Sequence, residues 1–122
     1  MKKKKILLAD DEEDIKLMTK IYLESRGYEV VTAFDGLDAL SQAEIELPDL
    51  ILLDVMMPVI DGFEVARRLK AGHNTAQIPV VMLSAASQSD IIKRGLEAGA
   101  QDYLVKPFDP HRLDALIQGI LG

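Results

Sequence analysis

The sequence predicts an α/β fold, a doubly wound five-stranded parallel sheet with strand order 2-1-3-4-5. Five short apolar runs alternate strictly with five segments of helical periodicity, which is typical of a parallel sheet with helices on both faces. One run, residues 50–53, is uniformly apolar and precedes an acid and a turn signal, as expected of a central strand buried on both faces. Right-handed crossovers leave few topologies for such units, and the doubly wound order is the one we expect.

The first βα unit begins with a predicted strand at residues 5–9, followed directly by acids at residues 10–14. Acidic side chains suit the first turn of a helix because they complement its dipole and its exposed N–H groups. Apolar side chains then recur at helical spacing, at Ile15, Met18, Ile21 and Tyr22. Gly27 lies where a helix can end on a glycine, and the β-branched segment 28–33 predicts the second strand.

Helix-capping signals lie on either side of the third predicted strand, residues 50–53. Asp35 is a candidate N-cap for a helix that Pro48 closes. The inner face of that helix would consist of Leu37, Leu40, Ala43 and Leu47. After the strand, Asp61 and Glu64 have the spacing of a capping box. The helix that they begin would bury Phe63, Ala66 and Leu69.

The last two units follow the same pattern. Residues 79–83 predict a strand whose proline suits its first position, and residues 87–90 (SQSD), from Ser87 to Asp90, resemble another helix cap. Residues 102–105 predict a short fifth strand. Asp109-Pro110 then caps and begins the last helix, with proline at its first position. The buried stripe of this helix would be Leu113, Leu116, Ile117 and Ile120.

The composition is that of one ordinary globular domain, which we expect to span residues 1–122. The absence of cysteine excludes a disulfide framework, a thiolate zinc site and a cysteine nucleophile. A net charge of −6 argues against direct nucleic acid binding by this domain. No apolar run approaches the roughly 20 residues that span a bilayer. The basic start, residues 2–5, precedes too short an apolar stretch for a signal peptide, so we expect no membrane association and a cytoplasmic location.

Polar side chains follow four of the predicted strands and would meet at one edge of the sheet. The first and third strands are neighbours where the winding reverses, and their carboxyl ends carry Asp10, Asp11 and Asp54. The fourth strand is followed by Ser84 and the fifth by Lys106. Three carboxylates, a hydroxyl and an ammonium would therefore lie in one crevice.

This set of groups predicts a magnesium-dependent phosphoryl acceptor. Carboxylates that lie close together repel one another, so their pKa values rise unless a cation is present, and Mg²⁺ prefers such oxygen ligands. A lysine ammonium can neutralise a transferring phosphoryl group, and a serine hydroxyl can donate a hydrogen bond to it. A carboxylate can itself be the nucleophile and form an aspartyl phosphate, a role for which Asp54 is the best candidate.

Four motifs resemble those of the receiver domain of two-component response regulators. They are residues 6–12 (ILLADDE), residues 52–58 (LLDVMMP) with Asp61-Gly62 after them, residues 83–85 (LSA) and residues 102–108 (DYLVKPF). Each motif alone is weak, but all four occur in order, and the resemblance extends over residues 5–121. It implies a signalling domain that accepts a phosphoryl group in a phosphorelay, and no enzymatic activity beyond self-phosphorylation and self-dephosphorylation.

The resemblance also implies roles for the residues of the crevice. Asp54 would be the phosphoacceptor, and Asp10 and Asp11 would be the acid pair that holds Mg²⁺ together with it, with Asp11 the more direct ligand. The backbone carbonyl of Met56 would supply another ligand. Lys106 would bind the phosphoryl group and would be joined to Pro107 by a cis peptide bond.

Ser84 and Tyr103 resemble the switch residues of this family. The serine would move toward the phosphoryl group and the tyrosine would then turn inward, which would change the surface formed by residues 87–121. The implied phosphoryl donor is a sensor histidine kinase or a histidine phosphotransfer protein. The implied readout is a downstream effector, a fused output domain or a second copy of the chain bound through residues 87–121.

Three other functions fit parts of the sequence. A magnesium-dependent phosphohydrolase with an aspartyl phosphate would want a second acid near the nucleophile, but Val55, Met56 and Met57 follow Asp54. A flavin-binding module of the same topology would have its cofactor phosphate repelled by the acids after the first strand. A receiver-like interaction module without phosphorylation would not need the full set of acids, serine and lysine, and a Mg²⁺ titration would identify it.

Overall fold

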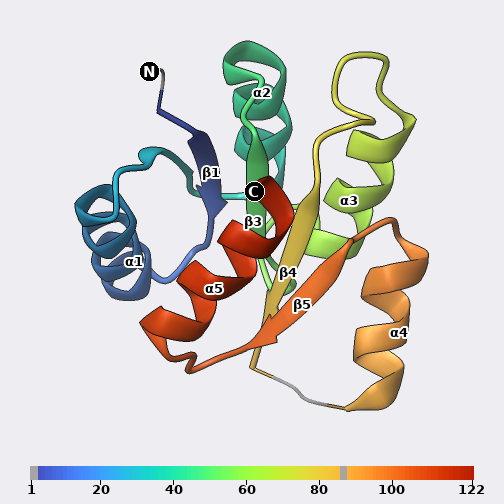
Figure 1. The fold of residues 1–122 in the computed structure, drawn as a ribbon. Helices are drawn as coiled ribbons and strands as arrows, with labels where there is room; N and C mark the ends of the chain where they lie inside the picture. Colours follow the sequence, from blue (N-terminus) through green and yellow to red (C-terminus); the bar gives the residue numbers. More distant parts are fainter. Residues whose placement is uncertain (1–2, 86–87) are drawn as a thin grey trace.

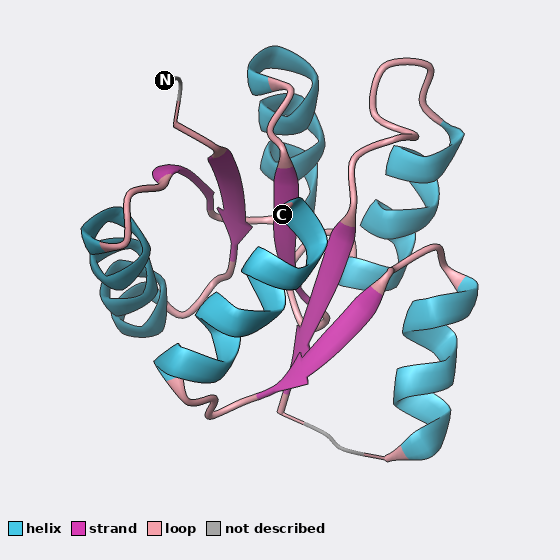
Figure 2. Cartoon of the chain, viewed as in Figure 1, coloured by secondary structure: helices cyan, strands magenta, loops and turns pink. Residues whose placement is uncertain are grey.

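The computed structural model describes residues 3–85 and 88–122 and confirms the predicted architecture. Five parallel strands form one sheet in the order β2-β1-β3-β4-β5, and a helix follows each strand (Figure 1, Figure 2). The strands are β1 (Lys5–Ala9), β2 (Glu29–Ala33), β3 (Leu50–Asp54), β4 (Val80–Ser84) and β5 (Asp102–Val105). The helices are α1 (Glu13–Ser25), α2 (Gly36–Glu46), α3 (Gly62–Ala71), α4 (Ser89–Glu97) and α5 (Pro110–Leu121). The cap expected at Ser87 lies outside the described residues.

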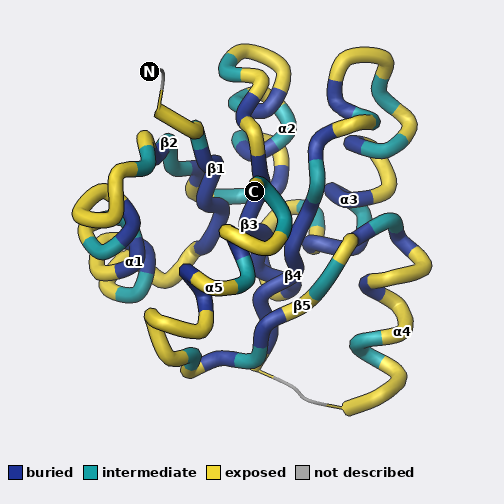
Figure 3. The backbone as a smooth tube through the Cα atoms, in the orientation of Figure 1, coloured by how far each residue is buried: buried dark blue, intermediate teal, exposed yellow. Residues whose placement is uncertain are grey.

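The helices cover the sheet in two layers, with α1 and α5 on one face and α2, α3 and α4 on the other (Figure 1). Alternate residues along each strand point to opposite layers, as the pleat of a strand requires. Ile51 and Leu53 therefore pack in the core beneath α2 and α3, whereas Leu50 and Leu52 pack beneath α1 and α5. Every residue of β3 is buried, as predicted for the central strand (Figure 3).

The predicted helix caps are confirmed at three positions. The carboxylates of Asp35, Asp61 and Asp109 each accept a hydrogen bond from a backbone N–H two or three residues later, at 2.7–2.9 Å. These bonds satisfy N–H groups that have no partner within a helix. Glu64 does not complete a capping box, because its carboxylate pairs with Arg68 and a neighbouring arginine further along α3.

The inner face predicted for α2 is partly wrong, and the apolar spacing noted for α1 does not mark its buried side. Met18 and Ile21 are exposed, and the buried side of α1 consists of Lys16, Thr19 and Leu23. In α2 the buried residues are Gly36, Ala39 and Ala43, while Leu37 and Leu47 are exposed. Close approach explains the small residues, since a Cβ on Gly36 would lie 2.4 Å from a side-chain carbon of the loop before α3. The larger apolar side chains therefore lie at the edges of this contact.

None of the helices in residues 3–85 and 88–122 is long and apolar enough to cross a membrane. The carboxyl ends of all five strands lie at one edge of the sheet, because the strands are parallel. The polar residues that follow these strands therefore lie at that edge.

Candidate functional site

The backbone fixes three chain segments beside one another at the carboxyl edge of the sheet. Asp10 follows β1, Asp54 is the last residue of β3, and Lys106 follows β5. Hydrogen bonds between neighbouring strands continue one residue past the strand ends. The N–H of Val55 donates to a carbonyl of β4 at 2.9 Å, and the N–H of Lys106 donates to the carbonyl of Ser84 at 2.7 Å. The side chains of the site are thus held on a rigid support.

The ammonium of Lys106 contacts three carboxylates. Its Nζ lies 2.9 Å from Asp10 Oδ2, 2.9 Å from Glu12 Oε1 and 3.2 Å from Asp54 Oδ2. The ammonium donates hydrogen bonds to Glu12 and Asp54, and its contact with Asp10 is an ion pair. Lys106 itself is buried, as are Asp10 and Asp54. Three carboxylates and one ammonium leave two formal negative charges in the site.

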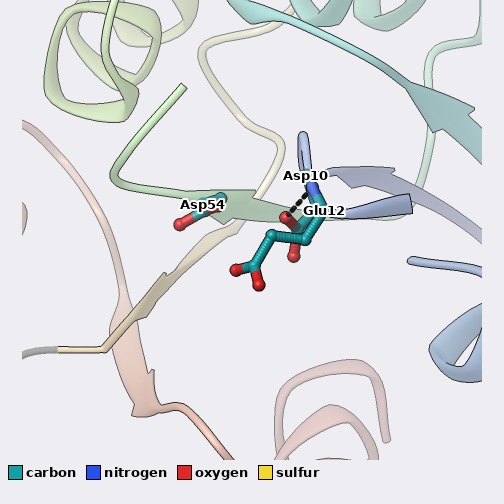
Figure 4. Close-up of side chains that lie close together, drawn as sticks. All are labelled: Asp10, Glu12 and Asp54. Carbon is teal, nitrogen blue, oxygen red and sulfur yellow. Dashed lines mark hydrogen bonds between the residues drawn. The ribbon is translucent and has the colours of Figure 1, made fainter. Parts of the chain in front are cut away.

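Asp10, Glu12 and Asp54 form a group that can hold a metal ion (Figure 4). One carboxylate oxygen from each lies within 4.8 Å of those from the other two. The N–H of Glu12 donates to Asp10 Oδ1 at 2.9 Å, and the N–H of Met56 donates to Asp54 Oδ1 at 3.3 Å. Asp10 Oδ2 is buried and accepts no hydrogen bond from the described residues, although it forms an ion pair with Lys106.

The electrostatics of the site favour a cation. Burial and, after it, the charge of Asp10 raise the pKa of Asp54 to about 7, although Lys106 acts in the opposite direction. Burial opposes the charged form of Lys106 as well, but its contacts with Asp10 and Glu12 outweigh this effect and raise the pKa of the ammonium. One lysine therefore does not fully compensate the carboxylates, and oxygen ligands with excess negative charge suit Mg²⁺.

The space beside these groups is an open cleft of about 240 Å³. Its lining consists of Asp11, Glu12, Asp54, Met56, Ala85 and Lys106. Mg²⁺ keeps several waters and binds few protein ligands, so a cleft of this kind, open on one side, fits the ion and leaves room for a phosphoryl group. The acidic site is thus consistent with Mg²⁺.

The structure brings together most of the residues expected from the sequence. Asp10, Asp54 and Lys106 are in contact, whereas Asp11 is exposed and borders the cleft without joining the acidic group. Sequence reasoning missed Glu12. Its backbone is extended in the structure, and residues two apart in an extended segment point to the same side, but the run of five acids did not show where the helix begins.

Ser84 and Tyr103 lie beside a separate small cavity of about 10 Å³ between α4 and the sheet. Ser84 is buried at the end of β4, and Tyr103 lies on the edge strand β5 with about a third of its surface exposed. The Lys106-Pro107 peptide bond is cis, as the resemblance implies. Met56 projects into solvent, and the expected role of its carbonyl stays a prediction.

Comparison with known sequences identifies relatives along nearly the whole chain. Residues 6–118 match the response regulator receiver domain. The chain is 47% identical over 118 residues to the alkaline phosphatase synthesis transcriptional regulatory protein PhoP of Bacillus subtilis. The aligned residues cover 97% of this chain and 48% of that protein. The chain spans about half the length of the curated relatives it matches.

Solved structures agree with this match. A response regulator from Chloroflexus aurantiacus superposes with a TM-score of 0.94 at 38% identity, covering 98% of each chain. The receiver domain of the sensor histidine kinase PA1611 from Pseudomonas aeruginosa superposes with a TM-score of 0.92 at 33% identity, covering 99% of each chain, and has magnesium coordinated in its active-site cleft. The protein therefore belongs to the response regulator receiver domains, which are phosphoacceptor signalling domains and not enzymes.

Proposed function

We propose that Asp54 of this domain accepts a phosphoryl group from a sensor histidine kinase or a histidine phosphotransfer protein. The observation that carries the proposal is the convergence of three carboxylates on the Lys106 ammonium, within 3.2 Å, at the carboxyl edge of the sheet. Asp54 is the acceptor because it ends the central strand and faces the open cleft. Phosphoryl transfer depends mainly on positioning and on charge neutralisation, and this arrangement provides both.

Each group in the cleft has a proposed part in the transfer. The side chains of Asp10, Asp11 and Asp54 and the carbonyl of Met56 would hold Mg²⁺, which when bound neutralises charge on the phosphoryl oxygens. A carboxylate oxygen of Asp54 attacks phosphorus, and the bond from phosphorus to the donor nitrogen breaks as the new bond forms. The Lys106 ammonium holds the phosphoryl oxygens as a fixed point charge.

The signal would pass from the cleft to the surface formed by residues 87–121. We propose that Ser84 donates a hydrogen bond to the phosphoryl group and that Tyr103 then turns toward the cavity beneath α4. That cavity holds about 10 Å³ and is too small for a phenol ring, so the inward position requires α4 or Ser84 to move. The altered surface would bind a downstream effector, a fused output domain or a second copy of the chain.

The organisation of the domain completes the proposal. Residues 1–122 would form one receiver domain that acts in the cytoplasm, where a kinase can reach its cleft. A net charge of −6 supports a domain that binds proteins and does not itself bind nucleic acid. The curated relative PhoP extends beyond the stretch that matches this chain, so a fused output domain would lie in segments outside that stretch.

An intact-mass experiment tests the assignment of Asp54. The protein is incubated with acetyl phosphate and Mg²⁺, and the wild type is expected to gain the mass of one phosphoryl group. Asp54→Asn should gain none, whereas Glu44→Gln, which removes one charge from the exposed side of α2, should behave as the wild type. Phosphorylation of Asp54→Asn at the wild-type level would refute the assignment, and no gain by the wild type with either acetyl phosphate or a kinase would refute the function.

A further inference from the structure

The three partners of the Lys106 ammonium differ in how easily each can leave it. The side chains of Asp10 and Asp54 are 1% and 5% exposed, whereas that of Glu12 is 56% exposed. A buried carboxylate that loses its cation is left as an uncompensated charge, which is strongly unfavourable. An exposed carboxylate exchanges its partner for water at little cost. Glu12 is therefore the partner that can be exchanged.

A phosphoryl group that arrives at Asp54 needs a hydrogen of this ammonium, but the ammonium already donates to Glu12 and Asp54 and forms an ion pair with Asp10. One partner has to give way when the phosphoryl oxygens arrive. The main chain of Glu12 is held, because its N–H donates to Asp10 and its carbonyl accepts from the N–H of Lys16. Only the side chain of Glu12 is free to turn, and because it is half exposed it can turn toward solvent.

We propose that Glu12 is a positioning residue for Lys106. Before phosphorylation its carboxylate holds the ammonium beside Asp54, and the arriving phosphoryl oxygen displaces that carboxylate and takes its hydrogen. The inference rests on the proposed function, since it assumes that Asp54 is the acceptor. Glu12 thus competes with the phosphoryl group for the lysine and slows its capture.

A different role for Glu12, as a direct ligand of Mg²⁺, makes different predictions. Its carboxylate lies close enough to those of Asp10 and Asp54 to reach a shared ion. A ligand would be needed for metal binding, whereas a partner of the lysine affects the metal only through its charge. Glu13 provides a matched control for that charge, because it is the next residue, is exposed and pairs with Lys16 instead of Lys106.

The first measurement uses the metal-free protein and no phosphoryl donor. The Lys106 ammonium is observed by ¹H–¹⁵N NMR, and its signal is assigned by its absence from Lys106→Arg. We expect Glu12→Gln to broaden this signal or speed its hydrogen exchange, because the ammonium loses a charged partner, and Glu13→Gln to leave it unchanged. An unchanged Lys106 signal in Glu12→Gln would overturn the proposal.

The second measurement separates metal binding from phosphoryl capture. Acetyl phosphate reaction rates are measured over a range of Mg²⁺ concentrations, which gives the half-saturating Mg²⁺ and the rate at saturation. Glu12→Gln is expected to raise the rate at saturation by up to about fivefold, the effect of one exposed ion pair, and to shift half-saturation no more than Glu13→Gln does. A half-saturating Mg²⁺ about tenfold above that of Glu13→Gln would assign Glu12 as a ligand and overturn the proposal.

The two measurements distinguish an error in the proposed function from an error in the role of Glu12. If neither the wild type nor Glu13→Gln accepts a phosphoryl group, the function is wrong, and the NMR signal still reports whether Glu12 holds Lys106. If both accept it and Glu12→Gln reacts no faster than the wild type at saturating Mg²⁺, the competition between Glu12 and the phosphoryl group is refuted while the function stands.

Discussion

Replacement of Asp54 by asparagine is expected to stabilise the metal-free protein at neutral pH. Burial raises the pKa of this carboxyl from its ordinary value of 3.8 to about 7. Between these two values the folded protein holds a proton that the unfolded chain has released. Stability therefore falls as the pH rises from about 4 to about 7 and is then constant, because both states are ionised above that range.

The magnitude follows from the size of the pKa shift. About three pKa units correspond to about 4 kcal/mol of unfolding free energy lost by pH 8, at about 1.4 kcal/mol for each unit. At pH 5 only about 1.5 kcal/mol of that loss has occurred, since pH 5 lies about one unit above the ordinary pKa. A buried amide still needs hydrogen-bond partners, which reduces the gain, so we expect Asp54→Asn to be more stable by about 2 kcal/mol at pH 8.

The assay is urea unfolding at pH 5 and pH 8 in a buffer that contains a metal chelator. Glu44→Gln is the control for the loss of one exposed charge and should stay within about 0.5 kcal/mol of the wild type. Mg²⁺ at ten times its Kd should stabilise the wild type by about 1.4 kcal/mol and Asp54→Asn by less. The reasoning is refuted if Asp54→Asn is no more stable than the wild type at pH 8, or if its advantage is the same at both pH values.

Three further substitutions test backbone strain, close packing and a buried ion pair, each by urea unfolding. Val59 is exposed and has a φ of 75°, which is a strained value for a β-branched residue. Val59→Gly should therefore raise the free energy of unfolding by about 1 kcal/mol, and a destabilised variant would show that no strain is relieved. A Cβ on Gly62 would lie 2.4 Å from a backbone oxygen of β3. Gly62→Ala should therefore lower the free energy of unfolding by about 2 kcal/mol or more, and an unchanged stability would contradict this close approach. Arg26 pairs with the buried Asp114 at 3.0 Å. Arg26→Met should therefore lower the free energy of unfolding by about 1–3 kcal/mol at pH 7. The same substitution should lower it much less in a protein that already carries Asp114→Asn.

The sheet was predictable because its signals are local and agree with one another. The third strand was expected at residues 50–53 and ends one residue later, at Asp54, because an apolar run in a buried parallel strand stops where a charge can reach the edge of the sheet. The strand order followed from alternation and handedness, and this order predicts that Asp10, Asp54 and Lys106 lie together, as they do in the structure.

The inner face of α1 was not predictable from the same signals. Helical periodicity tells which residues share a side of the helix, but two adjoining sides of α1 both carry apolar residues. The side that packs inward contains Thr19 and the long stem of Lys16, whose ammonium reaches Glu13 at 2.9 Å. A lysine can bury its stem in this way while its charge stays paired, so polarity alone did not identify the buried side.

The contribution of Glu12 was hidden for a related reason. It is one of five consecutive acids, and composition treats them all as suitable for the start of a helix. Which of them points at the lysine depends on backbone angles before the first turn. There the N–H of Glu12 bonds to Asp10, and both carboxylates contact Lys106, while Asp11 is exposed at the border of the cleft.

The charges at this edge of the sheet explain why phosphoryl acceptance should require a divalent cation. Three carboxylates around the Lys106 ammonium leave two negative charges, and conversion of Asp54 to a dianionic aspartyl phosphate adds one more. Even if Glu12 turns away, Asp10 and the dianionic aspartyl phosphate together carry three negative charges against the one positive charge of Lys106. A divalent cation removes this excess before transfer begins. Burial and, after it, the charge of Asp10 raise the pKa of Asp54, so ionisation of this carboxyl is disfavoured in the metal-free site and a bound cation would favour it.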